Sequence, residues 1–203
     1  MTIRLHKHDL PADWAAADAV AIDTETLGLN PQRDRLCLVQ LSRGDGTADL
    51  VQIAAGQKTA PNLVRVLADP AITKIFHFAR FDLAVLFHTF NVLCSPVYCT
   101  KIASKLTRTY SDKHGLKDLL RELLGVEISK QQQSSDWGAD KLSEAQLNYA
   151  ASDVLYLHQL KAKCDEMLAR EDRAAYAKAA YDFLPIRAKL DLLGWEGDLF
   201  AHS

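Results

Sequence analysis

The chain has 203 residues, 48% of them hydrophobic and 25% charged, with a formal net charge of -2. This composition excludes a disordered chain and is sufficient for one sizeable buried core. The near-neutral charge provides no global basic field, so a nucleic-acid partner would have to be bound by a local patch or by metal ions.

The four cysteines form no C-x-x-C pair (Cys37, Cys94, Cys99 and Cys164), and three of them have apolar neighbours, for which a reduced, core-filling role is expected. The sequence has no run of about eighteen apolar residues and no apolar N-terminal segment behind a basic start. We therefore expect a cytoplasmic protein without membrane association.

The N-terminal part predicts mostly strands. Residues 1–8 favour a short leading strand, and the alanine-rich residues 10–19, with Asp13 as N-cap, predict a helix. Apolar runs then predict three strands, which we expect to pair as an antiparallel meander, at residues 20–23, 35–42 and 47–53.

The middle of the chain predicts alternating helices and strands. Residues 60–67 behind Pro61 predict a helix, and residues 73–76 predict a fourth strand. Helical periodicity over residues 79–90 precedes a short strand at residues 97–99. A strand, helix and strand in succession imply parallel pairing with a right-handed crossover, so the predicted sheet is mixed.

The remainder predicts helices at residues 101–106, 115–124, 144–168 and 172–193. Pro185 would interrupt the last of these, because proline lacks the backbone N–H that a helix interior needs. The polar segment at residues 130–135 has the composition of a loop that is either mobile or reaches a substrate.

Two carboxylates, Asp23 and Glu25, stand at the end of the first buried strand. Side chains at i and i+2 of a strand share a face, so these acids would converge while Thr24 faces away. Their repulsion requires a cation, and Mg²⁺ or Mn²⁺ is suited to carboxylate ligands. A strand that ends in an acidic surface loop explains this pair equally well.

Further acids follow at two later positions. Asp82 lies in the first turn of the helix after the fourth strand, near the sheet edge where ligands bind, although the helix macrodipole alone also favours an acid there. Tyr149 and Asp153 share one face of a helix. They are either a core tyrosine and an unrelated acid or part of a site; the apolar neighbours of Asp153 favour a site, because an unpaired buried carboxylate is costly.

In order, Asp-x-Glu, His-x-Ala-x-x-Asp and Tyr-x-x-x-Asp resemble the three exonuclease motifs of the tyrosine branch of the DEDD superfamily. The likeness is greatest to ribonuclease D-like 3′→5′ exonucleases, and it extends over residues 20–168, including the segments at 114–120 and 130–137. This resemblance implies an α/β, ribonuclease H-like mixed sheet flanked by helices. It also implies one exonuclease domain over residues 1–203, with a helical extension at about 170–203 and no additional nucleic-acid-binding domain.

Carried over residue by residue, the resemblance assigns the catalytic set, with four metal ligands and a tyrosine that orients water: Asp23, Glu25, Asp82, Asp153 and Tyr149. Two divalent ions, Mg²⁺ or Mn²⁺, are implied. We hypothesise that Asp23 bridges both, Glu25 and Asp153 hold the ion that binds the attacking water, and Asp82 helps to hold the second. Phe78 departs from the family pattern, which often has asparagine or a small residue there.

The resemblance predicts a 3′→5′ exonuclease that releases nucleoside 5′-monophosphates, with the 3′ end of RNA favoured as substrate. Exonucleolytic DNA cleavage is the alternative within this class, because nothing in the motifs contacts the 2′-hydroxyl. A non-catalytic nucleic-acid-binding protein of the same fold is the alternative outside it. An aspartic protease is excluded because Glu25 stands where glycine is required after Asp23-Thr24. The sequence leaves the oligomeric state open.

The predicted substrate contacts are Thr24, Leu27, His77, His114 and Lys117. In the family an apolar side chain after the first motif lies near the terminal bases, a role for Leu27 or Leu29; an ordinary loop leucine is the alternative. One stretch of the chain is rich in basic residues: Lys101, Lys105, Arg108, Lys113, Lys117 and Arg121. It would bind phosphates, or it is an ordinary solvent-exposed face.

Overall fold

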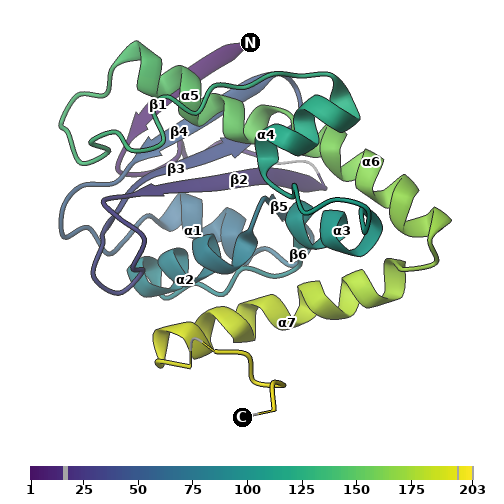
Figure 1. Ribbon diagram of the computed structural model, residues 1–203. Helices are drawn as coiled ribbons and strands as arrows, with labels where there is room; N and C mark the ends of the chain where they lie inside the picture. Colours follow the sequence, from purple (N-terminus) through teal and green to yellow (C-terminus); the bar gives the residue numbers. More distant parts are fainter. Residues whose placement is uncertain (16–17, 196, 203) are drawn as a thin grey trace.

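The computed structural model describes residues 1–15, 18–195 and 197–202. One six-stranded sheet, in the order β1-β4-β3-β2-β5-β6, runs through the middle of the molecule (Figure 1). Its strands are β1 (Thr2–Lys7), β2 (Ala19–Thr26), β3 (Leu36–Ser42), β4 (Thr47–Gln52), β5 (Thr73–Phe76) and β6 (Val97–Cys99).

The sheet is mixed, as the sequence predicts. Strands β2, β3 and β4 form the antiparallel meander, whereas β5 pairs in parallel with both β2 and β6. Strand β1 adds to the far edge in parallel with β4. Every residue of β3 is buried, which is why its apolar residues continue on both faces instead of alternating with polar ones.

Helices cover both faces of the sheet (Figure 1), with α1 and α2 on one side and α5 on the other. Helix α7 packs along α2, outside the first of these layers. The helices are α1 (Pro61–Ala68), α2 (Ala79–Phe90), α3 (Thr100–Thr107), α4 (Leu116–Leu119), the π-helix η1 (Leu120–Leu124), α5 (Glu144–Leu155), α6 (Leu157–Arg170) and α7 (Ala174–Leu192).

The helix predicted at residues 10–19 is wrong for its described residues, 10–15 and 18–19; residues 16–17 lie outside the described part. The Asp9 carboxylate accepts the backbone N–H groups of Asn62 and Leu63, which begin helix α1 without a cap of their own. The Trp14 indole donates to buried Asp49 at 2.8 Å. These distant anchors hold the segment in an irregular conformation with a turn, in which the Trp14 N–H donates to the Pro11 carbonyl at 3.0 Å, and they outweigh the helix propensity of its alanines.

Three predicted helices differ in detail. The helix expected at 144–168 is divided at Tyr156 into α5 and α6, and the one at 115–124 continues from α4 into a π-helix. Pro185 lies inside α7 without ending it. A local pattern predicts a helix from its periodicity, but packing decides whether the helix bends, widens or continues.

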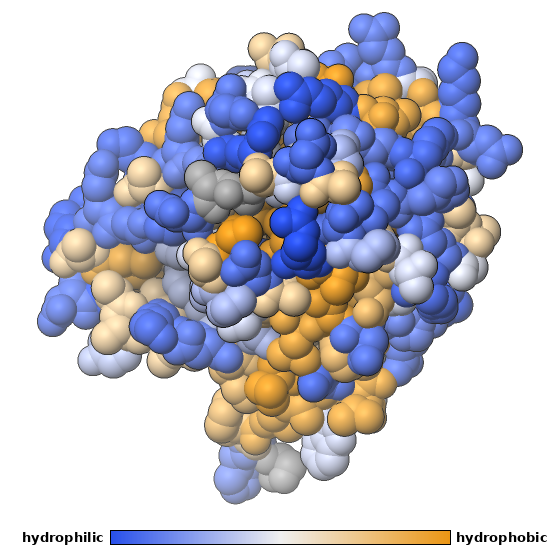
Figure 2. Space-filling model, turned by 180° about the vertical axis from the view of Figure 1, so that it is seen from behind, coloured by the Kyte–Doolittle hydropathy of each residue, from blue (hydrophilic) through white to orange (hydrophobic). Residues whose placement is uncertain are grey.

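Helix α7 and the segment after it leave apolar side chains in solvent. Figure 2 shows such residues gathered on the lower part of the molecule seen from behind, where α7 and the C-terminal segment lie. Exposed large apolar residues there are Ile186, Leu193, Trp195, Leu199 and Phe200. In the part of the chain that the structure describes, no helix is both long and apolar enough to cross a membrane.

Candidate active site

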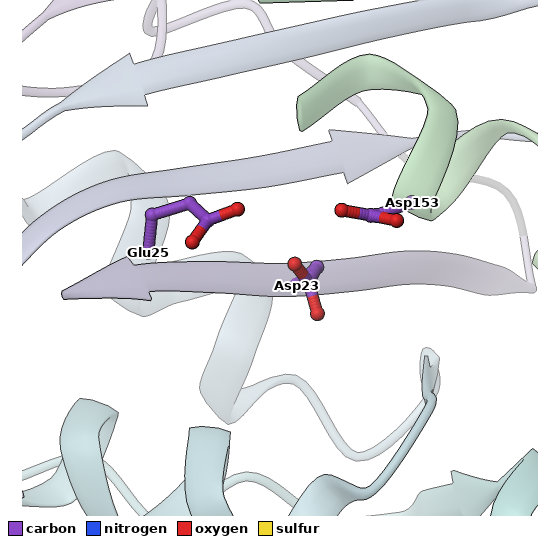
Figure 3. A group of neighbouring side chains, drawn as sticks. All are labelled: Asp23, Glu25 and Asp153. Atoms are coloured by element: carbon purple, nitrogen blue, oxygen red, sulfur yellow. The ribbon is translucent and has the colours of Figure 1, made fainter. Parts of the chain in front are cut away.

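Strand β2 carries the first two acids of the site. Asp23 and Glu25 lie two residues apart on the strand, while Thr24 between them is buried. The register with β3 shifts between Glu25 and Thr26, so the strand becomes irregular directly after the second acid. One carboxylate oxygen from each of Asp23, Glu25 and Asp153 lies within 4.8 Å of the other two. Figure 3 shows Glu25 and Asp153 pointing toward each other beside Asp23 on β2.

Helix α5 brings Asp153 to β2 from a distant part of the chain. Its N-terminus is a capping box, in which Ser143 accepts the Gln146 N–H and the Gln146 side chain accepts the Ser143 N–H. The Gln146 amide also donates to the Asp136 carbonyl at 3.1 Å. The start of α5 is thereby anchored to the preceding loop, and this anchor helps to place the helix that carries Asp153.

Asp82 lies in the first turn of α2 and is buried. The Thr24 hydroxyl donates to its carboxylate at 2.7 Å. Asp82 is outside the group of three carboxylates, but the charge of Asp23 is one cause of its raised pKa, so the two acids influence each other. Thr24 therefore faces away from Asp23 and Glu25, as its strand position predicts, and contacts the fourth acid instead.

The four acids repel one another in the fold. Burial raises the pKa of Asp23 to about 7, and burial together with the charges of Asp23, Asp153 and Asp82 raises the pKa of Glu25 to about 10. Burial and the charge of Asp23 likewise raise the pKa of Asp82 and Asp153. Within the described residues no lysine or arginine forms an ion pair with these acids. Such a set fits divalent cations, because a cation would favour the ionised form of every member.

Tyr149 lies one helical turn before Asp153 and interacts with its carboxylate. Burial, followed by the charges of Asp153, Glu25 and Asp23, raises the pKa of the Tyr149 phenol. The Tyr149 ring packs against Trp137, with 5.9 Å between ring centroids. The phenol is thus a protonated hydrogen-bond donor held at the edge of the carboxylate group.

Three of the four acids, Asp23, Glu25 and Asp153, open into a cleft of about 610 Å³, whereas Asp82 is not among the described residues that line it. Among its lining residues are Asp23, Glu25, Tyr149 and Asp153, and three lysines, Lys101, Lys117 and Lys130. The charge of Lys130 also lowers the pKa of Asp153, against the larger effect of burial. The cleft therefore combines a half-buried acidic floor with separate cationic side chains, which is suited to a phosphodiester bound through metal ions.

Four of the five predicted substrate contacts line this cleft. Thr24, Leu27, His77 and Lys117 line it, whereas His114 is not among the described residues that do. Burial and the charge of Lys101 lower the pKa of His77 to about 3, so its imidazole is neutral. The His77 ring lies 2.9 Å from the Thr100 hydroxyl, and the His114 ring 2.8 Å from the Ser104 hydroxyl.

Arg108 does not belong to an exposed phosphate-binding track, contrary to the basic stretch inferred from the sequence. Its side chain is fully buried and pairs with Glu122, and it donates to the Lys113 carbonyl at 2.5 Å. A charge pattern along a sequence does not distinguish a solvated arginine from one that organises its own loop. Lys101 and Lys117 are the members of that stretch that line the cleft.

Leu27 is 53% exposed and lines the cleft, as expected of a residue near terminal bases. A Cβ atom built on Gly138 would lie 2.8 Å from the Leu27 side chain, so this leucine packs closely against the backbone that follows Trp137. The predicted role of Leu27 stays a prediction.

Sequence reasoning missed two residues beneath the site. Gln40 is fully buried on β3, and its amide lies 3.4 Å from the Asp23 carboxylate. A lone amide in the apolar strand Leu36–Ser42 was the available signal. Trp137 was noted only as part of a family segment; its aromatic neighbour, Tyr149, is twelve residues away and no local pattern connects the two.

Comparison with known proteins identifies the group to which this geometry is similar. The family model described as 3′-5′ exonuclease matches residues 6–169. Ribonuclease D of Gluconacetobacter diazotrophicus is 38% identical over 154 residues, which cover 76% of this chain and 39% of that protein. The chain thus spans about two fifths of the length of this curated relative.

Solved structures agree with this match. Brucella melitensis NrnC has been solved with bound Mg²⁺ and bound to pGG, at 65% and 66% identity, TM-scores of 0.96 and 0.97, and full coverage of both chains. Escherichia coli RNase D, described as an exoribonuclease involved in structured RNA processing, is 29% identical over 85% of this chain and 45% of its own, with a TM-score of 0.76. The expected resemblance to ribonuclease D and the ribonuclease H-like α/β fold are confirmed.

Proposed function

This chain belongs to the 3′-5′ exonuclease family, and we propose that it is a metal-dependent exoribonuclease of the ribonuclease D type. It hydrolyses the phosphodiester bond at the 3′ end of RNA and releases nucleoside 5′-monophosphates. Short oligoribonucleotides, down to dinucleotides such as pGG, are the proposed substrates. Residues after 169, including α7, would extend the exonuclease domain.

One observation carries this proposal. Asp153 is 130 residues from Asp23 in the sequence, yet carboxylate oxygens of Asp23, Glu25 and Asp153 lie within 4.8 Å of one another. Three half-buried acids at this distance repel one another and destabilise a metal-free fold at neutral pH, so a purely structural role does not account for them. A catalytic site that binds cations does.

Four carboxylates, Asp23, Glu25, Asp82 and Asp153, would hold two divalent ions. When bound, such ions lower the pKa of a water molecule and neutralise charge on phosphate oxygens and on the leaving 3′-oxygen. Thr24 holds the Asp82 carboxylate through its hydroxyl, and Gln40 contacts Asp23 from the neighbouring strand. These contacts orient the acids, so that little reorganisation is needed when the substrate arrives.

The Tyr149 phenol would position the attacking water. Because its pKa is raised by burial and by the acids nearby, the phenol keeps its proton at neutral pH and acts as a donor rather than as a base. Its packing on Trp137 restricts the ring to one orientation. Tyr149 thus contributes geometry and proton relay, and the acidic group contributes the electrostatic environment.

The substrate range rests on the dimensions and charges of the cleft. A volume of about 610 Å³ lies within the range of sites for small ligands. Lys101, Lys117 and Lys130 line the same cleft and would contact phosphates on either side of the scissile bond. The structure of NrnC, which is similar over the whole of both chains, is bound to pGG, and this supports the dinucleotide as substrate.

A time course with the purified chain tests the proposal. RNA and DNA oligonucleotides labelled at the 5′ or the 3′ end, together with pGG, would be incubated with Mg²⁺, with Mn²⁺ or with chelator. We expect stepwise shortening of 5′-labelled RNA, early release of label from 3′-labelled RNA, and no reaction with chelator.

Asp153→Asn provides the matched control, because it keeps the shape of the side chain and removes its charge. That variant should lose at least about 100-fold in activity while its melting temperature stays near or above that of the wild type, since an uncompensated charge is removed. Appreciable metal-dependent cleavage by Asp153→Asn, or faster cleavage of DNA than of RNA, would contradict the proposal.

A further inference from the structure

Phe78 has an unusual backbone for a bulky residue. It is the N-cap of α2, with φ 68° and ψ 45°, which is the left-handed region. Non-glycine residues in that region are uncommon, and aromatic residues pay a steric cost there. The Phe78 side chain makes no capping hydrogen bond, so helix initiation does not explain why phenylalanine stands at this position. Strain of this kind is concentrated at functional sites.

The Phe78 ring lies in the active-site cleft and not in the core. The residue is 46% exposed, whereas its neighbour Ala79 is fully buried. Phe78 lines the same cleft as Asp23, Glu25 and Asp153. An apolar ring exposed above an acidic floor gains nothing from water, but it would gain from a ligand with a flat aromatic face.

Lys101 occupies one face of this ring. Its ammonium nitrogen lies 4.3 Å from the Phe78 ring centroid, a cation–π distance. Lys101 belongs to the first turn of α3, so two different elements fix the orientation of the ring. Within the described residues no carboxylate pairs with Lys101, which leaves its charge available for a phosphate.

On the basis of the proposed exonuclease function, we propose that Phe78 is a stacking platform for one nucleobase of the bound oligonucleotide. Lys101 holds the ring from one face and meets the adjacent phosphate. An aromatic ring with a cation beside it matches the base and phosphate of a single nucleotide. Every base has a π-face, so this contact would bind without preference for one base. The left-handed backbone at Phe78 is the device that directs the ring into the cleft.

Kinetics with altered bases test this assignment. The substrates would be pGG and two analogues, each lacking the base at one of its two positions. Phe78→Ala should raise the KM for pGG about 10- to 100-fold, the range measured for loss of one stacked base, with a smaller change in kcat. The loss should disappear with the analogue that lacks the stacked base and persist with the other one.

Two further variants separate stacking from a structural role. Phe78→Asn places a residue that tolerates the left-handed region, so it should melt at or above the wild-type temperature and still bind as weakly as Phe78→Ala. Phe78→Trp should bind at least as well as the wild type, and pGG should quench its fluorescence more than that of the wild type, in which Trp137 lines the same cleft. Tyr176→Ala, an exposed aromatic residue on α7 outside the cleft, serves as the control and should leave KM unchanged.

The outcomes distinguish the two proposals. An unchanged KM in Phe78→Ala, or an equal loss with pGG and both analogues, would overturn the stacking assignment and leave the exonuclease proposal in place. If the wild type cleaves nothing while pGG still quenches Phe78→Trp more than the wild type, the exonuclease proposal fails and the stacking site remains. An unquenched Phe78→Trp in an active enzyme would also overturn the assignment.

Discussion

At the scale of single residues, Thr24 lies between two acids of β2 and its hydroxyl donates a hydrogen bond to a third acid, Asp82. Asp23 and Glu25 face one side of β2, and Thr24 uses the other side to donate to Asp82 at 2.7 Å. Asp82 is almost completely buried, with 4% of its surface exposed. Backbone N–H groups of Thr24 and Asp82 also interact with this carboxylate, so the hydroxyl is one of several groups that orient it.

We predict that Thr24→Val weakens binding of the second divalent ion about 10- to 100-fold, because a hydrogen bond to a charged group contributes about 1.5–3 kcal/mol. Valine has nearly the same shape, and the matched variant Thr24→Ser keeps the hydroxyl. Calorimetric titration with Mn²⁺ would measure both variants without any substrate. Equal Mn²⁺ affinity in the valine and serine variants would show that Thr24 does not position Asp82.

At the scale of elements, one carboxylate joins α7 to α2. Asp191 accepts hydrogen bonds from Arg80 of α2, at 2.6 and 2.7 Å, and from Arg187 of α7, at 2.6 and 3.1 Å. Burial acts to raise the pKa of Asp191, but the two guanidinium groups lower it below its ordinary value. The ion pairs attach the last helix to the layer that carries Asp82.

Asp191→Asn should destabilise the protein by about 2 kcal/mol, because charge-assisted hydrogen bonds across α2 and α7 are lost. For a chain of this size the melting temperature would fall by about 4–8 °C. Asp182→Asn on the same helix, whose Lys178 pair is exposed, is the control and should change little.

The pKa of Asp191 is lowered in the folded state, so the stabilisation by this carboxylate is present above the unfolded value of 3.8 and is lost as the pH falls below it. A pH-independent difference between Asp191→Asn and the wild type would contradict this origin.

At the scale of the whole molecule, the acidic group couples folding to metal binding. The pKa of Asp23 is raised from 3.8 to about 7 in the fold, and that of Glu25 from 4.5 to about 10. A raised pKa means that the folded state binds protons more tightly than the unfolded chain does. The corresponding stability is present below about pH 4 and is lost as the pH rises through the folded pKa values.

We therefore predict that the metal-free protein loses several degrees of melting temperature between pH 5 and pH 8. Excess Mg²⁺ or Mn²⁺ should reverse this loss, because the ions bind the ionised acids. Thermal melts with chelator or with metal across this range would measure the effect. Glu25→Gln should flatten the pH dependence of the metal-free protein. A melting temperature of the metal-free wild type that rises from pH 5 to pH 8 would be the opposite of this expectation.

Most of the secondary structure could be predicted from local patterns. Strands β5 and β6 and helix α2 have the predicted bounds, because each is marked by an apolar run or a helical period that depends on neighbours in the sequence. The segment at 10–19 could not be predicted, since Asp9 and Trp14 are anchored by α1 and β4. Local propensity fails where a distant partner determines the backbone.

By itself, the sequence determined most of the order of strands and helices, the spacing of Asp23 with Glu25 and of Tyr149 with Asp153, and the family to which these motifs belong. Only the tertiary structure decided that Asp153 approaches β2, that Arg108 is buried, and that Phe78 directs its ring into the cleft. The physical reason is the range of the interactions. Periodicity and capping act within a few residues, whereas burial, ion pairing and the pKa of an acid depend on groups that only the folded chain brings together.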